Sequence, residues 1–353
     1  MQTPLSARVV LCAAVSFAFA SVAAHAASGL DAYALSAAGE SHFGAIPGSP
    51  FSCATFGPDA RTAGFGGIVQ VGLPTDGAVC GVAVDTRSAS AASGSVSVAS
   101  TLAVGFGPSG DLKAFVGDSA GRAEYGNLGV RASASYSGST NSGVVTGSQA
   151  FGRQTEAMSF GGASGNGTYR PTFTIDGSLF GVGREYSELS FFYSVGASPS
   201  FLAFRIVEAY GALSFYAPGG YPGMTTTGDL ATGFTVAGQT TFTLSIPIVF
   251  GTASDITYAL WGSVLPLSSV GQLTPSAGDV SFMSTARLTG IEVLDGAGRP
   301  LSDFSIESGS GTRYGPTGVV AIAAVPEPET FALFGAGLLA LGAGVRRRRR
   351  RRE

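Results

Sequence analysis

The chain has 353 residues, of which 45% are hydrophobic, 12% are charged and 53 are glycine. The sparse charge excludes an ordinary disordered chain, and glycine without a three-residue period excludes collagen. Few Lys, Glu and Leu residues beside abundant Gly, Ser, Thr, Val and Phe exclude a helical bundle and favour a β-rich fold. Residues 27–325 hold 12 basic and 20 acidic side chains, a net charge of about −8, which excludes a nucleic-acid-binding body.

The N-terminal segment, residues 1–26, has the three parts of an export signal. Arg8 gives it a weakly basic start, residues 9–24 are apolar, and Ala24-His25-Ala26 is the small-x-small pattern that precedes a cleavage site. We predict cleavage after Ala26. The alternative is an uncleaved membrane anchor, which the small residues and the polar Ser28 disfavour.

Two cysteines, Cys53 and Cys80, remain after cleavage. An even pair in an exported, oxidising compartment predicts a disulfide, and two buried free thiols are the alternative. The bond would close a loop of about 27 residues and stabilise the fold by on the order of 3 kcal/mol. With these cysteines paired and His42 the one mature histidine, zinc and iron lack ligands, so we predict no metal and no cofactor.

The body, residues 27–320, shows period-two alternation between turn signals, which predicts many short antiparallel strands. Pro247 predicts an edge strand, because proline cannot donate to a sheet on both sides. Asp295-Gly296-Ala297-Gly298 predicts a hairpin turn from which Phe304 and Ile306 return. The clearest alternating stretches are 95–98, 131–136, 173–175, 191–193, 202–206, 242–248 and 291–293.

Side-chain size changes along the body. Residues 88–167 are built from Ser, Ala, Gly, Thr and Val, whereas the strands after Arg170 are bulky and aromatic. We predict an all-β, jelly-roll-like β-sandwich in which the first half supplies small residues and the second half supplies the aromatic core. The alternative is two subdomains that meet near residues 161–168.

Two short motifs resemble catalytic or nucleotide-binding signatures. Residues 117–121, Gly-Asp-Ser-Ala-Gly, match the nucleophile elbow of hydrolases, but no helical pattern follows and His42 lies upstream of the serine. We interpret them as a turn between strands. Residues 105–110 match a dinucleotide fingerprint, but a strand pattern follows, so they predict a hairpin loop. The sequence therefore predicts a protein that is not an enzyme.

The C-terminal segment has three parts in a fixed order. A linker, residues 321–329, contains Pro326, Glu327 and Pro328; an apolar stretch, residues 330–345, predicts a short membrane helix; and an arginine-rich tail, residues 346–353, predicts a cytoplasmic end. The fifteen apolar residues 331–345 would span about 22 Å as a helix, which suits a temporary stop in a bilayer better than a permanent anchor. The topology determinants are Arg346, Arg347, Arg348, Arg349, Arg350, Arg351 and Arg352.

This tail resembles the PEP-CTERM sorting signal of Gram-negative bacteria, which is also catalogued as an ice-binding protein C-terminal domain. The resemblance implies recognition and processing by an exosortase after passage through the inner membrane, and an association with exopolysaccharide. The body, on residues 148–160 and 284–293, is similar to a loosely defined group of PEP-CTERM proteins with β-sandwich ectodomains. That group has no established activity, so it implies no catalytic residues.

The main functional hypothesis is a non-enzymatic protein of the cell surface or extracellular matrix. One alternative is a polysaccharide-binding module, in which aromatic residues such as Tyr216, Tyr221 and Trp261 stack on sugars. A second is a glycoside hydrolase, which needs two carboxylates about 5–10 Å apart. Ice binding needs repeated threonine arrays, and in the sequence the run at residues 225–227 is isolated.

Overall fold

The computed structural model describes residues 28–40, 52–55, 78–106, 113–137, 144–183, 185–196, 198, 201–209, 212–216, 224–229, 233–268 and 276–320. Within these ranges every regular element is a β-strand and none is a helix. The strands are β1 (Gly29–Glu40), β2 (Ser52–Thr55), β3 (Ala78–Ala91), β4 (Ser95–Phe106), β5 (Lys113–Glu124), β6 (Asn127–Ser137), β7 (Val144–Gly161), β8 (Asn166–Val182), β9 (Glu185–Val195), β10 (Phe201–Ala209), β11 (Ala212–Tyr216), β12 (Met224–Asp229), β13 (Gly233–Thr243), β14 (Ile246–Val249), β15 (Ser254–Ser268), β16 (Ser276–Leu294), β17 (Ser305–Ser308), β18 (Tyr314–Gly315) and β19 (Gly318–Val319).

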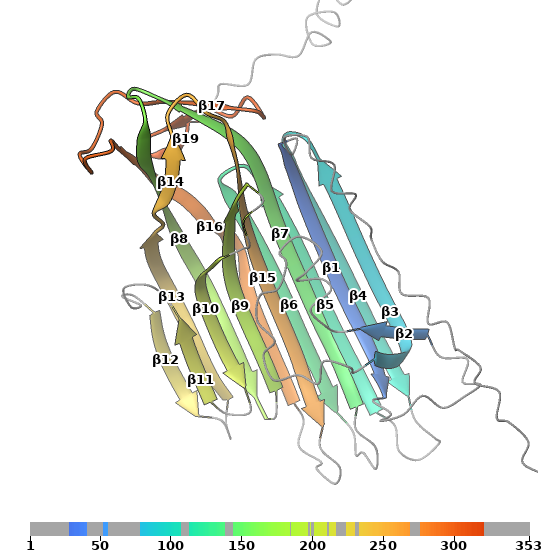
Figure 1. Ribbon diagram of the computed structural model, residues 1–353. Coiled ribbons are helices and arrows are strands. Elements are labelled where there is room, and N and C mark those ends of the chain that lie inside the picture. The colour runs from blue at the N-terminus through green and yellow to red at the C-terminus, as the bar shows by residue number, and fades with distance from the viewer. Residues whose placement is uncertain are drawn as a thin grey trace, which may run out of the picture. The chain divides into compact units, whose positions relative to one another are not determined.

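The described strands form two large antiparallel sheets that pack face to face (Figure 1). The nine-stranded sheet has the order β11-β10-β9-β15-β7-β1-β3-β2, with β17 also paired to β7. The eight-stranded sheet has the order β12-β13-β8-β16-β6-β5-β4, with β14 also paired to β8. Strands from both sides of residues 161–168 contribute to each sheet. The predicted all-β fold with antiparallel strands is confirmed.

Alternation of apolar and polar residues positions these strands, as the sequence predicted. In β8, Tyr169, Phe173, Ile175 and Leu179 are buried, while the residues between them face outward. The strands are longer than expected, however, and β16, β7 and β8 reach 19, 18 and 17 residues. Their length was missed because glycines within them read as turn signals.

The aromatic residues of the second half fill one end of the core. Phe173 of β8 contacts Phe191 of β9 and Tyr258 of β15, with ring centroids 4.8 and 4.9 Å apart. Phe242 of β13 contacts Phe191 at 5.3 Å and Phe204 of β10 at 5.8 Å. These rings come from both sheets, so they hold the two layers together at this end.

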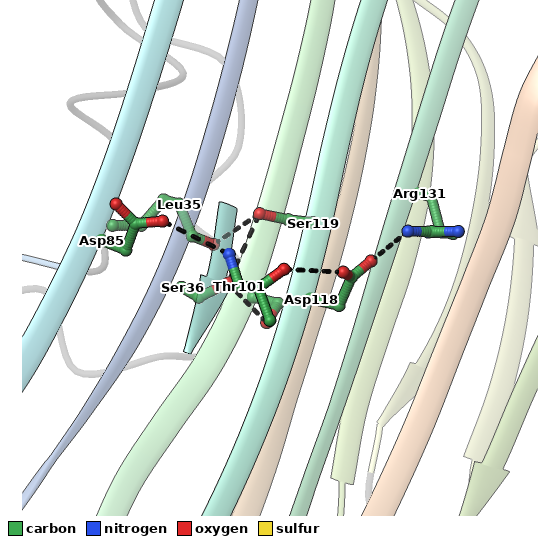
Figure 2. Close-up of polar contacts among 8 residues, drawn as sticks. Leu35, Ser36, Asp85, Thr101, Asp118, Ser119 and Arg131 are labelled. Atoms are coloured by element: carbon green, nitrogen blue, oxygen red, sulfur yellow. Dashed lines mark hydrogen bonds and ion pairs between the residues drawn. The ribbon is translucent and has the colours of Figure 1, made fainter. Parts of the chain in front are cut away.

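Serine and glycine fill the other end of the core, where β1, β3 and β7 face β4 and β5. The Oγ of Ser119 on β5 donates to the Leu35 carbonyl oxygen at 3.1 Å and lies 3.5 Å from the Oγ of Ser36 on β1 (Figure 2). The Oγ of Ser36 lies 3.3 Å from that of Ser148 on β7. All three serines are buried and their hydroxyls link the two sheets, on the same side of β5 as the fully buried Phe115.

Residues 117–121 lie in the middle of β5, so the prediction of a turn there is wrong. Gly121 faces the other sheet, and a Cβ at this position would lie 2.4 Å from the Phe151 carbonyl oxygen and 2.6 Å from that of Tyr33. Glycine is therefore required by close approach of two backbones and not by a turn. Ser119 is buried within the same interface, which gives it no access to a substrate.

The two loops that the sequence predicted can be compared with the structure. Residues 107–112 connect β4 to β5, whose register pairs Phe106 with Lys113, so the predicted hairpin connection is confirmed. The 295–298 turn is also present, closed by the Asp295 N–H donating to the Arg299 carbonyl at 2.9 Å. The predicted return of Phe304 and Ile306 beside residues 291–293 is wrong, because β17 crosses to the other sheet, where Ile306 pairs with Phe160 of β7.

Two strands at sheet margins show how the margins are protected. Pro247 lies in β14, which pairs with β8 alone among the described strands, as the proline predicted. At the margin formed by β4, the Thr101 N–H donates to the Asp85 carboxylate on β3 at 3.3 Å (Figure 2). The Ser100 Oγ donates to the Asp85 carbonyl oxygen at 2.9 Å. These two bonds fasten β4 to the opposite sheet.

The export signal, the linker, the membrane helix and the arginine-rich tail all lie outside the described residues. Residues 320–353 form a unit separate from residues 1–319. In the part of the chain that the structure describes, no helix is both long and apolar enough to cross a membrane.

Candidate functional site

The predicted sorting and cleavage residues cannot be placed, because Ala24, Ala26, Pro326, Glu327, Pro328 and the run of residues 346–352 lie outside the described ranges. The two cysteines lie in described strands, Cys53 in β2 and Cys80 in β3. The register places their Cα atoms directly opposite each other. Directly opposed residues of antiparallel strands have Cα separations of about 4.5–5.5 Å, within the range that a disulfide spans. Formation of the bond stays a prediction.

The aromatic residues that were candidates for sugar stacking do not form an exposed platform in the described residues. Trp261 on β15 is only 1% exposed and packs with Phe192 and Ala259. Tyr216 lies in β11 and Tyr221 in an undescribed segment, and the side chains of both lie outside the described residues. Trp261 therefore supplies packing, whereas Phe201 of β10 is 48% exposed and lies against Tyr193 of β9, with ring centroids 5.4 Å apart.

The outward side of the eight-stranded sheet instead carries a cluster of threonines on β8, β13 and β16. We call this cluster the hydroxyl face. Cross-strand pairing brings the residues together, because Thr174 pairs with Thr241 and Thr172 pairs with Thr243. The hydroxyl face comprises Thr172, Thr174, Thr241, Thr243 and Thr289.

Hydrogen bonds between side chains hold these hydroxyls in a row. The Oγ1 of Thr174 lies 3.2 Å from that of Thr241 and 3.0 Å from that of Thr289. The Oγ1 of Thr172 lies 2.8 Å from that of Thr243. Thr241, Thr243 and Thr289 are exposed. Each hydroxyl oxygen retains acceptor capacity after one such bond, so the face can still bind donors from a ligand.

Charged residues continue the outward side toward β6 and β5. Asp118 on β5 pairs with Arg131 on β6 and accepts a hydrogen bond from the Thr101 Oγ1 at 3.0 Å (Figure 2). At the other border of the face, the Arg170 Nη1 lies 2.6 Å from the Glu292 Oε2. The Arg170 guanidinium lies two residues along β8 from Thr172, and planar guanidinium groups bind carboxylate and phosphate groups bidentately.

Two carboxylates flank one serine on this same side. Ser133 on β6 pairs with Asp118 of β5 on one side and with Asp279 of β16 on the other. The two aspartates are therefore two strands apart, with Cα atoms separated by about 10 Å. Burial raises the pKa of Asp279, against the lowering effect of Arg131, and the charge of Asp118 raises it further. Inverting glycoside hydrolysis needs an acid and a second carboxylate whose carboxyl groups lie about 6.5–9.5 Å apart, and Asp279 and Asp118 supply two carboxyl groups on either side of Ser133.

No cluster of three or more His, Cys, Asp and Glu side chains suitable for a metal ion occurs among the described residues. The polar side chains described on this outward side are hydroxyls, carboxylates and arginines.

Sequence reasoning missed the hydroxyl face, since its threonines come from three strands far apart in the chain. The available signal was threonine at alternate positions, as in Thr172 and Thr174 or Thr241 and Thr243.

Comparison with known proteins assigns the tail. Residues 324–350 match the PEP-CTERM protein-sorting motif, in agreement with the resemblance drawn from Pro326, Glu327 and Pro328. This motif is the mark of exported proteins of Gram-negative bacteria that an exosortase processes. Neither a curated protein nor a solved structure shows significant similarity to the chain.

Proposed function

Starting from the PEP-CTERM protein-sorting motif at residues 324–350, we propose that this chain is a non-enzymatic protein of the cell surface or extracellular matrix that associates with exopolysaccharide. An N-terminal signal would export it, and the short helix at residues 330–345 would hold it in the inner membrane until processing. The matched motif carries this proposal. The two packed sheets support a β-sandwich ectodomain as the part that is delivered.

The hydroxyl face supports polysaccharide as the ligand. Adjacent strands lie about 4.8 Å apart and alternate residues of one strand about 7 Å apart, so the face presents hydroxyls at intervals similar to those of a sugar chain. Thr174 lies at its centre, bonded to Thr241 on one neighbouring strand and to Thr289 on the other. An extended, flat array suits a long polymer better than a small molecule, which concave sites bind.

The sorting step is tested by replacing Pro326, Glu327 and Pro328 together with alanine in the producing bacterium. We expect the variant to be exported and inserted normally but to accumulate at full length, which is read by immunoblotting of cell fractions. Glu329→Ala, beside the motif, is the matched control and should be processed normally. Processing of the triple variant at the normal rate would show that the tail is a plain membrane anchor.

Ligand binding is tested with two pairs of threonine substitutions. Thr174→Val with Thr241→Val removes hydroxyls from the hydroxyl face and keeps the side-chain shape. Thr155→Val with Thr257→Val does the same to a bonded pair on the other sheet, whose Oγ1 atoms lie 3.1 Å apart, and is the control. We expect only the first pair to lower retention by exopolysaccharide, about tenfold for two lost hydrogen bonds. Equal retention of both variants contradicts the proposal.

Glycoside hydrolysis is the second candidate function, favoured by Asp118 and Asp279 on either side of Ser133. If the protein is a hydrolase, Asp279→Asn should abolish release of reducing sugar from the exopolysaccharide and leave binding intact. If the purified wild-type protein releases no sugar from the polysaccharide that it binds, this candidate is excluded.

A further inference from the structure

A buried carboxylate, Glu156 of β7, lies inside the described body with no exposed surface. Among the described residues it accepts five hydrogen bonds. Its Oε1 accepts from the Ser28 Oγ at 3.2 Å, the Ser308 Oγ at 2.7 Å and the Ser310 N–H at 2.9 Å. Its Oε2 accepts from the Ser310 Oγ at 2.9 Å and the Tyr314 O–H at 3.2 Å. A buried carboxylate depends on such donors, because desolvation of its charge is otherwise uncompensated.

The five donors come from two places that are far apart in the chain. Ser28 is two residues after the predicted cleavage point, whereas Ser308, Ser310 and Tyr314 precede the sorting motif, which begins at residue 324. One carboxylate on a central strand therefore binds both ends of the described body.

Backbone contacts bring the same two ends against each other. The Ala157 N–H donates to the Ser28 Oγ at 3.3 Å, and the Gly309 N–H donates to the Ala157 carbonyl at 2.8 Å. A Cβ at Gly309 would lie 2.6 Å from the Ser28 Oγ, so only glycine permits this approach. Ser28 thus donates a hydrogen bond to Glu156 and also forms part of the surface against which Gly309 packs.

The two phenols that neighbour Glu156 keep their protons. Burial raises the pKa of Tyr125 to about 12, and the negative charge of Glu156 adds to this rise. Burial also raises the pKa of Tyr314, again with a contribution from Glu156. Both phenols therefore remain protonated, so that Tyr314 is available as a donor at any physiological pH.

We propose that Glu156 is a latch that holds the segment after the export signal and the segment before the sorting motif against β7, so that neither end is released without the other. Loss of either set of donors leaves the buried carboxylate short of hydrogen bonds, which weakens its hold on the remaining set. The body consequently closes only when residues 308–314 have crossed the membrane, shortly before the sorting motif itself.

Hydrogen–deuterium exchange of the purified full-length chain in detergent, followed by mass spectrometry, tests the latch. Ser28→Ala removes a donor at the N-terminal side, and we expect amides of residues 305–315 to exchange about tenfold faster. Tyr314→Phe removes a donor at the C-terminal side, and we expect the amides at the start of β1 to exchange faster by a similar factor. Ser190→Ala is the matched control, since its Oγ donates at 2.6 Å to Glu188, a buried carboxylate on β9 outside the latch.

The outcomes separate a latch from two independent contacts. Coupling across the two ends in both variants, with neither end changed in Ser190→Ala, supports the proposal. If Ser28→Ala affects only residues 28–40 and Tyr314→Phe affects only residues 305–320, the ends are independent and the proposal is overturned. Glu156→Gln must accelerate exchange at both ends, and acceleration at one end alone also overturns it.

Discussion

Gly121→Ala tests how closely the two sheets approach at the end of the core that serine and glycine fill. The new Cβ would lie 2.4 Å from the Phe151 carbonyl oxygen and 2.6 Å from that of Tyr33, and both obstacles are backbone atoms. Because a carbon–oxygen contact needs about 3.2 Å, the sheets must separate locally by about 0.8 Å. Overpacking of this kind costs about 2 kcal/mol.

Separation of the sheets also lengthens the serine hydrogen bonds two residues away. The bond from Ser119 to the Leu35 carbonyl is 3.1 Å and that to Ser36 is already 3.5 Å, so neither tolerates a further 0.8 Å. Loss of one buried bond adds about 1 kcal/mol. We therefore expect Gly121→Ala to lower the free energy of unfolding by about 3 kcal/mol in total.

The assay is urea unfolding followed by the fluorescence of Trp261, the single tryptophan of the chain, which is buried in the native state. Gly290→Ala on β16 is the control, because its nearest neighbour is a Thr172 side-chain atom at 3.4 Å, an ordinary contact. We expect the control to stay within about 0.5 kcal/mol of the wild type. Equal stability of the two variants would refute the account of Gly121 as a point of backbone contact.

Three further predictions concern stability. Cys53→Ser should abolish the mobility difference between reduced and oxidised protein on gels and cost on the order of 3 kcal/mol, if Cys80 is its partner. Ser119→Ala should cost about 1–2 kcal/mol by urea unfolding, because the Leu35 carbonyl loses its donor inside the core. The raised pKa of Asp279 means that its charge opposes folding. Asp279→Asn should therefore match the wild type in thermal stability below pH 3.8 and exceed it increasingly as pH rises through the folded pKa.

Prediction from sequence succeeded where the information was local. Alternation around Phe173 and Ile175 predicted a buried strand face, and Pro247 predicted an edge strand. Both predictions succeeded because each signal is set by residues within a single strand. Prediction from sequence failed at Gly117, where a Cβ would meet the side chains of Phe115 and Ser148, and at Gly121, where a Cβ would meet the backbone of the opposite sheet. A glycine that permits close approach and a glycine that permits a turn look the same in a sequence.

The hydroxyl face shows the same limit for function. The adjacent threonines at residues 225–227 were visible in the sequence, whereas Thr174, Thr241 and Thr289 come together only through strand register. Register depends on long-range pairing and on shifts such as the one between Leu288 and Gly290, which single-sequence patterns do not encode. The sorting motif, in contrast, is contiguous and was identified from its own residues.

The hydrogen bond from the Thr101 N–H to the Asp85 carboxylate affects how the margin formed by β4 can pair with a strand of another molecule. Proteins displayed on a surface meet their own copies at high local concentration, and an open strand margin invites a foreign strand to add to the sheet. At Thr101 the backbone N–H of β4 is already bonded to the Asp85 carboxylate, so a strand that approached β4 there would meet a negative charge instead of a free donor. A strand that paired with β4 at this point would therefore gain no hydrogen bond from the Thr101 N–H.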